Sequence, residues 1–380
     1  MKGDFTRVSF DPRNHFSGVF QQQGRVTLDA DVNENTAILL HHIRTLTRDL
    51  FGPHGGPADG NGFLLAVDSS GSTPRLTISA GHYYVEGLLC EAEVPCDYAE
   101  QPDWLPPPPD DAGAGGDPLL AWLASANRSP DQRFWVYLDV WERHVSWIED
   151  ERIREAALGG PDTCTRAKVV WQVKALPWDP AWSSTANRSP CVAPMVALSP
   201  LGSARMAAQL DPGQQIADPC TISPESRYRG AENQLYRVEI HHGGDASAAS
   251  FKWSRDNGSV ATRWLSTDGT DLVAKSARGF SAGDWVELSH DALDLAGLPG
   301  QLLRLSKVQG DRLTPDPASA GGDGVLAWSE SFVNPKLRRW DQRGNDDVVL
   351  SEGAVPIDES STIEPGWIAL EDGIQVRFEA

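Results

Sequence analysis

A stripe of apolar residues predicts a helix close to the N-terminus. Its members are spaced by seven, four, three and four residues: Val32, Leu39, Ile43, Leu46 and Leu50. This spacing places them on one face of an α-helix. The helix is predicted to end near Phe51, because Gly52-Pro53 follows at once and this pair does not continue a helix.

The start of this segment has the spacing of a calcium loop, with acidic or amide side chains at Asp29, Asp31 and Asn33. An EF-hand loop needs Gly at its sixth position and Glu at its twelfth. Here those two positions hold Glu34 and Leu40, so the calcium interpretation fails. We predict instead that Asp29 or Asp31 caps the helix, and that Glu34 adds favourable negative charge in its first turn.

The same stripe can be written as heptads. Val32, Leu39 and Leu46 then occupy position d, and position a is occupied by Thr36, Ile43 and Leu50. Fewer than three heptads do not establish a coiled coil. Two interpretations stay open: a helix packed on its own domain, and a helix shared between subunits.

Beyond the Gly- and Pro-rich connector 52–62 the hydrophobic period changes from helical to two residues, which is typical of strands. We predict a strand or hairpin over 133–148 and a strand over 234–242. Segment 165–176 is predicted as a strand, although its length would also allow a helix. Segments 101–118 and 177–225 read as connections. The predicted fold is mostly β with an N-terminal α-helix, in the α+β class, with no βαβ alternation. It has an arm and helix in residues 1–60 and two β-rich domains, 61–230 and 231–380, the second of which includes a small barrel-like unit.

One hairpin is predicted in detail from FKWSRDNGSVATRW, residues 251–264. Asn257-Gly258 accepts the positive φ angles of a type I′ turn. A two-residue loop there places Phe251 opposite Trp264, Trp253 opposite Thr262, and Arg255 opposite Val260.

Charge excludes two classes of partner. The net charge is −20, which opposes binding to nucleic acid or to anionic membranes. Residues 1–60 hold six basic and seven acidic side chains, so nearly all of this charge lies beyond them and self-association meets least repulsion there. No apolar run is long enough to cross a bilayer, and no Sec signal is visible. We expect assembly in the cytoplasm, with an extracellular or released particle as a further destination, and five reduced cysteines, since their number is odd and no C-x-x-C pair occurs.

Motifs for catalysis are missing from the sequence: there is no G-x-S-x-G, H-E-x-x-H or Walker loop. We therefore predict no catalytic group, no cofactor and no metal site, and a protein that is not an enzyme. Most of the 14 Trp residues lie in β-patterned runs, which favours core packing over stacking on sugars. One basic segment, PKLRRWDQR, binds either the chain's own carboxylates or an acidic partner subunit through Lys336, Arg338, Arg339 and Arg343.

A set of longer motifs resembles a known family: MKGDFTR, QQGRVTLDADVNE, RDLFGPHGGP, YYVEGLLCE, LDVWERHVSWIED, YRGAENQLYRVEIH, FKWSRDNGSV and LEDGIQVRF. They are similar to a large bacterial domain-of-unknown-function family that is often encoded beside phage-tail-like contractile injection systems. The start is also similar to N-terminal segments of some phage baseplate and tail-fibre proteins. This chain departs from the family pattern at Val32, where Trp is usual, and in ending at Ala380, where members tend to continue.

The resemblance implies a structural subunit of a contractile injection system or phage-tail-like particle, at its baseplate, spike or fibre attachment. The expected partners are other subunits of that particle and further copies of this chain. A strand or extended arm through residues 22–26 and the helix would form the assembly interface, with contact residues Gln22, Gly24, Arg25, Val32, Leu39, Ile43, Leu46 and Leu50. The alternatives are a fibre-like adhesin that binds glycan through exposed Trp residues and, third, a delivered effector or enzyme.

Overall fold

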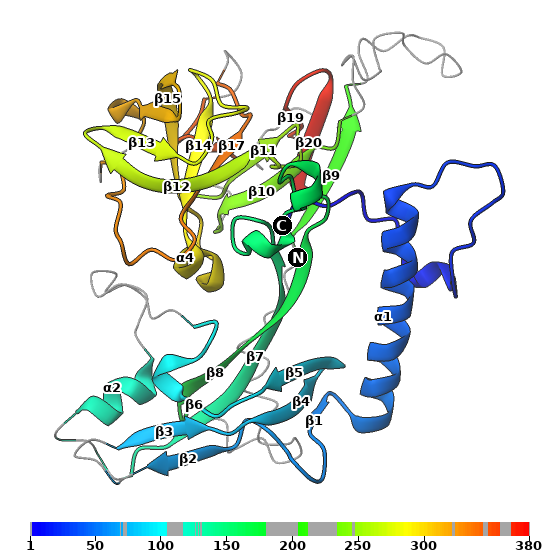
Figure 1. Ribbon diagram of the computed structural model, residues 1–380, viewed down its shortest axis with the longest axis vertical. Helices are drawn as coiled ribbons and strands as arrows, with labels where there is room; N and C mark the ends of the chain where they lie inside the picture. The colour runs from blue at the N-terminus through cyan, green and yellow to red at the C-terminus, as the bar shows by residue number, and fades with distance from the viewer. Residues whose placement is uncertain are drawn as a thin grey trace. The chain divides into compact units, whose positions relative to one another are not determined.

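The computed structural model describes residues 2–68, 70, 74–104, 117–125, 127, 129, 131–179, 204–211, 234–244, 248–320, 324–344, 349–357 and 366–379. The chain divides into two compact units, Met1–Ser199 and Pro200–Ala380. Most of the described regular structure is β, which confirms the predicted mostly β class (Figure 1). No helix in these ranges is both long and apolar enough to cross a membrane.

The first unit begins with an arm that contains one 3-10 turn and leads into the helix α1 (Asp29–Phe51). Two three-stranded antiparallel sheets follow, in the orders β1-β4-β5 and β2-β3-β6. Their strands are β1 (His54–Gly55), β2 (Leu65–Asp68), β3 (Arg75–Ile78), β4 (Gly81–Val85), β5 (Leu88–Ala92) and β6 (Cys96–Asp97). The short helix α2 (Pro118–Ala124) comes next, and the Asp117 carboxylate caps its first N–H groups.

A long antiparallel ribbon completes this unit. Strands β7 (Phe134–Val145) and β8 (Arg166–Pro177) pair over twelve residues without a register shift, from Phe134 opposite Pro177 to Val145 opposite Arg166. The segment 133–148, predicted as a strand or hairpin, therefore contains a single strand, β7. The segment 165–176 forms the strand β8 and not a helix. One face of β8 contributes Trp171, Val173 and Ala175 to the core of the unit, together with Ile78, Cys90, Tyr98, Leu119 and Leu123.

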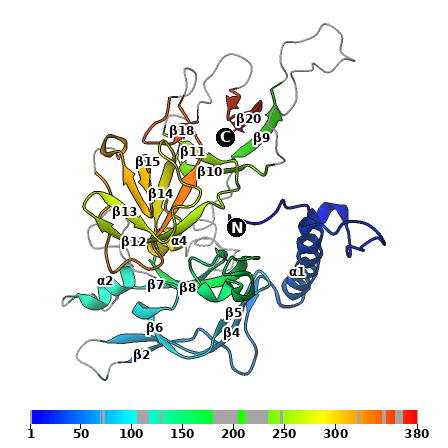
Figure 2. The same ribbon diagram turned by 45° about the horizontal axis from the view of Figure 1, so that its top comes forward.

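The second unit contains a closed antiparallel barrel of six strands, in the order β12-β13-β16-β15-β14-β17 (Figures 1 and 2). The strands are β12 (Ala261–Asp268), β13 (Asp271–Ala274), β14 (Trp285–Ser289), β15 (Gln301–Gln309), β16 (Arg312–Pro315) and β17 (Lys336–Trp340). Large apolar side chains fill the interior, so the barrel is a packed core. They include Trp264, Leu272, Leu288, Leu303, Leu305 and Leu337, each exposed by 1% or less. The short helix α4 (Asp291–Ala296) follows β14.

Two smaller sheets belong to the same unit, in the orders β10-β11-β18 and β19-β20-β9. Their strands are β9 (Arg205–Leu210), β10 (Arg237–His242), β11 (Ser250–Ser254), β18 (Val355–Pro356), β19 (Ile368–Ala369) and β20 (Ile374–Glu379). A second apolar cluster joins them, in which the Phe251 and Phe378 rings lie 5.0 Å apart between centroids.

The predicted hairpin over 251–264 is wrong. The turn forms, with positive φ at Asn257 (55°) and Gly258 (66°). Its two arms nevertheless join different sheets: β11 pairs with β10 and β18, whereas β12 pairs with β13 and β17. Phe251 and Trp264 therefore lie in separate cores.

The two arms do not pair with each other because residues about 80 positions further along the chain bond to both of them. Strand β17 and the residue that follows it bond to both arms: Arg339 N–H donates to the Val260 carbonyl at 2.9 Å and Asp341 N–H to the Trp253 carbonyl at 2.8 Å. The Asp341 carboxylate also accepts hydrogen bonds from Ser254 and from the N–H of Arg255. These bonds satisfy the backbone groups that a hairpin would have paired.

Candidate functional site

The arm of the first unit is fixed at its start and runs beside α1 (Figure 1). The Asp4 carbonyl accepts a hydrogen bond from Thr165 at 3.1 Å and lies 3.2 Å from the His144 ring. Further along, Ser9 donates to Glu34 of α1 at 2.5 Å, and the Phe10 ring lies 5.5 Å from that of His41.

The tip of the arm is a turn and not a strand. The N–H of Arg25 donates to the carbonyl of Gln22 at 3.2 Å, and Gly24 has a φ of 72°. Of the two predicted forms of residues 22–26, a strand or an extended arm, the strand does not form, because glycine in this conformation closes a turn there. All three predicted contact residues at this tip, Gln22, Gly24 and Arg25, are exposed.

The predicted end of α1 is confirmed, whereas the N-cap residue is neither Asp29 nor Asp31. The helix stops at Phe51, and the N–H of Gly52 bonds to the Arg48 carbonyl at 2.8 Å. At the other end Leu28 is the N-cap residue, without a side-chain cap bond, and Asp29 is already inside the first turn. Hydrogen bonding from Thr6 and from the N–H of Ala30 lowers the pKa of Asp29, so this carboxylate serves the arm as well as the helix start.

One side of α1 packs on its own unit. Ala30 is 3% exposed and Ile38 is fully buried. The Arg44 guanidinium donates two hydrogen bonds to the Glu142 carboxylate on β7, at 3.1 and 2.7 Å. The turn after β4 approaches so closely that a Cβ built at Gly87 would lie 2.4 Å from the Arg44 carbonyl oxygen. These contacts fix the rotation of the helix about its axis.

The predicted stripe lies on the other side and is exposed. We define the outer face of α1 as the six heptad positions Val32, Thr36, Leu39, Ile43, Leu46 and Leu50. Its five large apolar members are exposed by 54%, 54%, 59%, 60% and 69% in chain order. In the described structure the stripe is thus not the contact between α1 and its own unit.

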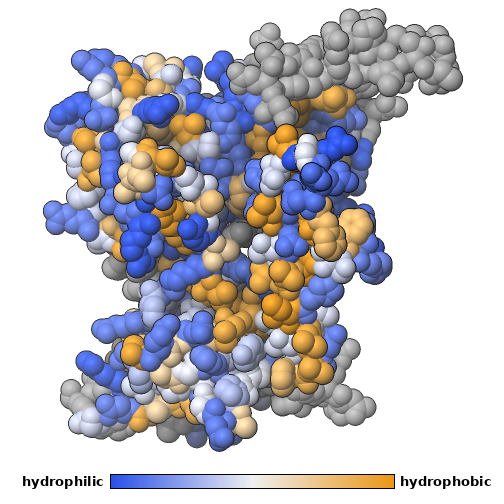
Figure 3. All heavy atoms as spheres, turned by 45° about the vertical axis from the view of Figure 1, so that its right-hand side comes forward, coloured by the Kyte–Doolittle hydropathy of each residue, from blue (hydrophilic) through white to orange (hydrophobic). Residues whose placement is uncertain are grey.

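The arm carries further exposed apolar side chains, Phe16, Phe20 and Val26, which are 57%, 90% and 83% exposed. Of the 25 large apolar side chains that are exposed among the described residues, 12 lie between residues 8 and 51. Apolar side chains also gather on the face that carries α1 (Figure 3). Such a concentration exceeds the scattered apolar residues of an ordinary surface, so residues 8–51 are the candidate interaction surface of the described chain.

The basic segment on β17 is mostly used within the second unit. Lys336 is 4% exposed and donates to Asp294 at 2.5 Å. Arg338 donates to the carbonyl of Gly258, and Arg339 donates to Asp256. Of the four predicted partner-binding cations, only Arg343 is exposed. Lys336 and Arg339 thus bind the chain's own carboxylates, and Arg338 binds a backbone carbonyl of the same unit.

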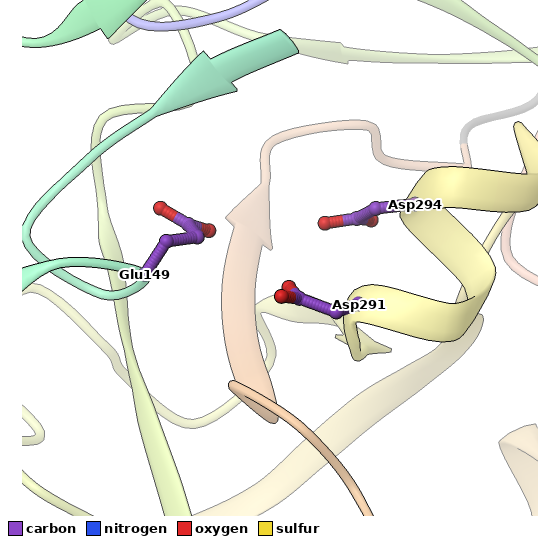
Figure 4. A group of neighbouring side chains, drawn as sticks. All are labelled: Glu149, Asp291 and Asp294. Atoms are coloured by element: carbon purple, nitrogen blue, oxygen red, sulfur yellow. The ribbon is translucent and has the colours of Figure 1, made fainter. Parts of the chain in front are cut away.

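Two carboxylates project from α4 (Figure 4). Asp294 accepts hydrogen bonds from Ser289 at 2.8 Å and from Lys336, and Asp291 accepts one from Asn334 at 2.8 Å. Glu149, which is labelled in the same figure, belongs to the first unit and accepts two bonds from Ser146. Each carboxylate has donors from its own unit, and we assign no ligand to this group.

A charged network that sequence reasoning missed is buried in the second unit. Lys252 is 1% exposed and forms an ion pair with Glu287, which is 7% exposed. Glu287 also accepts bonds from the Trp340 indole at 2.8 Å and the Gly300 N–H at 2.9 Å. Burial opposes ionisation of Glu287, but the Lys252 ammonium and these hydrogen bonds lower its pKa far below the usual range. The network is saturated with partners, so it stabilises the fold and does not resemble a poised acid or base. Its only signal in the sequence is a Lys inside an apolar strand, FKW.

The comparisons with known proteins identify a family but not an activity. No curated protein and no solved structure matches the chain. One family model, described as a family of unknown function (DUF6519), matches residues 1–189 and 195–380. Since these matches cover nearly the whole chain, the protein belongs to the DUF6519 family of unknown function.

Proposed function

We propose that this protein is a non-enzymatic structural subunit of a larger protein particle, of the phage-tail-like contractile kind, at its baseplate, spike or fibre attachment. Residues 1–52 are its assembly element. The observation that carries this proposal is the exposure of the outer face of α1, together with the apolar tip of the arm.

The free energy of burying apolar side chains favours contact of the outer face of α1 with a partner over its exposure to solvent. Full burial of one large aliphatic side chain contributes about 1.5–3 kcal/mol, so five half-exposed ones contribute on the order of 5 kcal/mol. Association costs roughly 4–15 kcal/mol in lost freedom, and side-chain ordering adds to it. The outer face alone is therefore marginal. A subunit that is held at several contacts within a particle meets this cost once and gains from each contact.

The remaining surfaces give little support to catalysis. The described part of the first unit has an apolar pocket of about 370 Å³, lined by side chains such as Leu65, Trp122 and Phe134 and by no titratable group. A pocket of this kind lacks the convergent polar groups of an active site. For the adhesin alternative, exposed Trp rings along a groove would be the favouring feature. Every Trp in the described ranges is buried or half-buried, so we do not advance that function.

The proposal is tested in cells that encode the protein. A tagged chain is expressed there, high-molecular-weight particles are sedimented and purified, and the tagged protein is measured in each fraction. We expect the wild-type chain in the particle fraction and the variant Ile43→Asp/Leu46→Asp in the free fraction. Both substituted positions are exposed, so the variant retains its fold.

A matched control separates loss of assembly from a general effect of new charge. Val94 and Leu158 are apolar, lie in the same unit outside the assembly element, and are 70% and 64% exposed. The variant Val94→Asp/Leu158→Asp should enter particles as the wild type does. A wild-type chain that never sediments with a particle, or an outer-face variant that still does, would overturn the proposal.

A further inference from the structure

We infer that the outer face of α1 binds a second copy of this chain, helix against helix, and that the arm completes the interface. This inference rests on the proposed function, since it identifies one partner of the same surface. It goes further by naming that partner and by dividing the contact between two segments.

Helix α1 cannot bury its outer face in its own unit. The opposite side already carries Ile38, the bidentate contact of Arg44 with Glu142, and the close approach of Gly87. Rotation of the helix would break all three contacts. The outer face is therefore presented outward by the fold itself.

The outer face of α1 has the shape of a narrow apolar seam. Its six positions follow a spacing of four, three, four, three and four residues, which is the narrow seam of a coiled coil. A helix that packs on a globular domain has a wider apolar face. A seam is complementary to another seam, and a second copy offers an identical one. Ile43 at position a between Leu39 and Leu46 at position d is a pattern that favours two strands, so we infer a dimer.

The residues beside the seam carry little charge. The positions that flank a seam are e and g, and here they hold Asn33, Asn35, Leu40, His42, Thr47 and Asp49. Asp49 is the only Asp, Glu, Lys or Arg among these six. Two copies can therefore bring their seams together without like-charge repulsion, although the whole chain has a net charge of −20. An unrelated, strongly charged partner would find no counter-charges on this face.

The outer face of α1 is too small to form a stable dimer interface without the arm. A large aliphatic side chain covers roughly 60–120 Å², so the five half-exposed members of the seam supply about 400–700 Å² for a pair of helices. A stable interface buries about 1,200–2,000 Å² in total. Phe16, Phe20 and Val26 close most of this difference, because one aromatic side chain buries about 150–250 Å². The dimer contact consequently requires the arm as well as the helix.

The experiment measures the mass of the purified full-length chain in solution over a wide range of concentration, by light scattering and by sedimentation equilibrium. We expect a reversible dimer for the wild type and for the control Val94→Asp/Leu158→Asp. Ile43→Asp/Leu46→Asp should be a monomer, with an unchanged circular dichroism spectrum. Phe20→Ser should weaken dimerisation at least tenfold.

A second outer-face variant tests whether loss of the dimer results from misfolding of the chain. Leu39→Gln/Ile43→Gln/Leu46→Gln keeps helix-forming residues and adds no charge, and it should also be a monomer. A wild-type chain that stays monomeric at the highest concentration overturns the inference, as does a dimer that survives both outer-face variants. If such a monomer still enters particles through Ile43 and Leu46, the proposed function stands and only the second copy is wrong.

Discussion

The Arg44 guanidinium holds the Glu142 carboxylate by two hydrogen bonds, 98 residues apart in the sequence. This pair joins the middle of α1 to the strand β7. It thereby decides which side of the helix faces the unit and which side faces outward.

Replacing Arg44 by Ala should loosen α1 without unfolding the β structure. Both side chains of the pair are about 30% exposed, at 31% and 28%, so solvent screens the interaction and the loss of stability should be only about 1 kcal/mol. Amide hydrogen exchange should accelerate in α1 and stay unchanged in β7 and β8. Equal acceleration throughout the unit would contradict a local role for this pair.

Substitutions of two glycines test how closely the turn after β4 packs against α1. Gly24 and Gly87 both have positive φ, 72° and 80°. A Cβ at Gly24 would meet nothing within 4 Å, whereas at Gly87 it would meet the backbone of Arg44. Gly24→Ala should cost about 1–2 kcal/mol from backbone strain alone. Gly87→Ala should cost clearly more in denaturant unfolding, and equal costs would show that the turn is not packed on the helix.

Breaking the buried ion pair of the second unit should be severe. Lys252→Met removes the cation from beside Glu287 and leaves a buried carboxylate uncompensated, which typically costs about 3–5 kcal/mol. The double variant Lys252→Met/Glu287→Leu removes both charges and should recover most of that stability. Urea unfolding of the wild type, the single variant and the double variant measures the difference. A single variant as stable as the wild type would contradict the pairing.

The Glu287 carboxyl group should make the stability of the second unit depend on pH. The pKa of Glu287 is lowered in the folded state, so its contribution is fully present above the unfolded pKa of about 4.3. It is lost as pH falls from there toward the folded pKa, because the unfolded chain then binds more protons. Unfolding free energies measured between pH 6 and pH 3 should therefore fall less steeply in Glu287→Gln than in the wild type. Parallel curves would show that Glu287 does not carry this dependence.

The cysteines should differ in reactivity. Burial raises the pKa of the Cys90 thiol to about 11, whereas Cys164 is exposed. Thiolate is the reactive form, so alkylation of the native protein should modify Cys164 first and leave Cys90 protected until the chain unfolds. Cys90, Cys96 and Cys164 are free thiols, and Cys191 and Cys220 lie outside the described residues. Titration of the denatured protein without reductant should find five thiols, and a count of three would reveal a disulfide.

Features encoded by neighbouring residues were predictable from the sequence. The end of α1 follows from Gly52-Pro53, and the strand β8 follows from its β-branched and aromatic content. The turn at Asn257-Gly258 also formed, because its positive φ angles depend on those two residues alone. These signals act through local backbone preferences, which do not need the rest of the chain.

The candidate surface was predicted in part for the same reason. The helical period showed that Val32, Leu39 and Leu46 share a side of α1, but a period carries no information about what covers that side. Contacts with Glu142 and Gly87 decided that the stripe faces outward. Those partners lie about 40 to 100 positions away from the helix.

Only the tertiary structure decided which strands pair and which charges are buried. Phe251 and Trp264 flank one turn, yet Asp341 and the strand before it bond to the arms and send the two rings into different cores. Lys252 is buried because Glu287 meets it across the fold. Local preferences limit the dihedral angles of each segment. Pairing and burial depend instead on residues that are brought together only when the whole unit has folded.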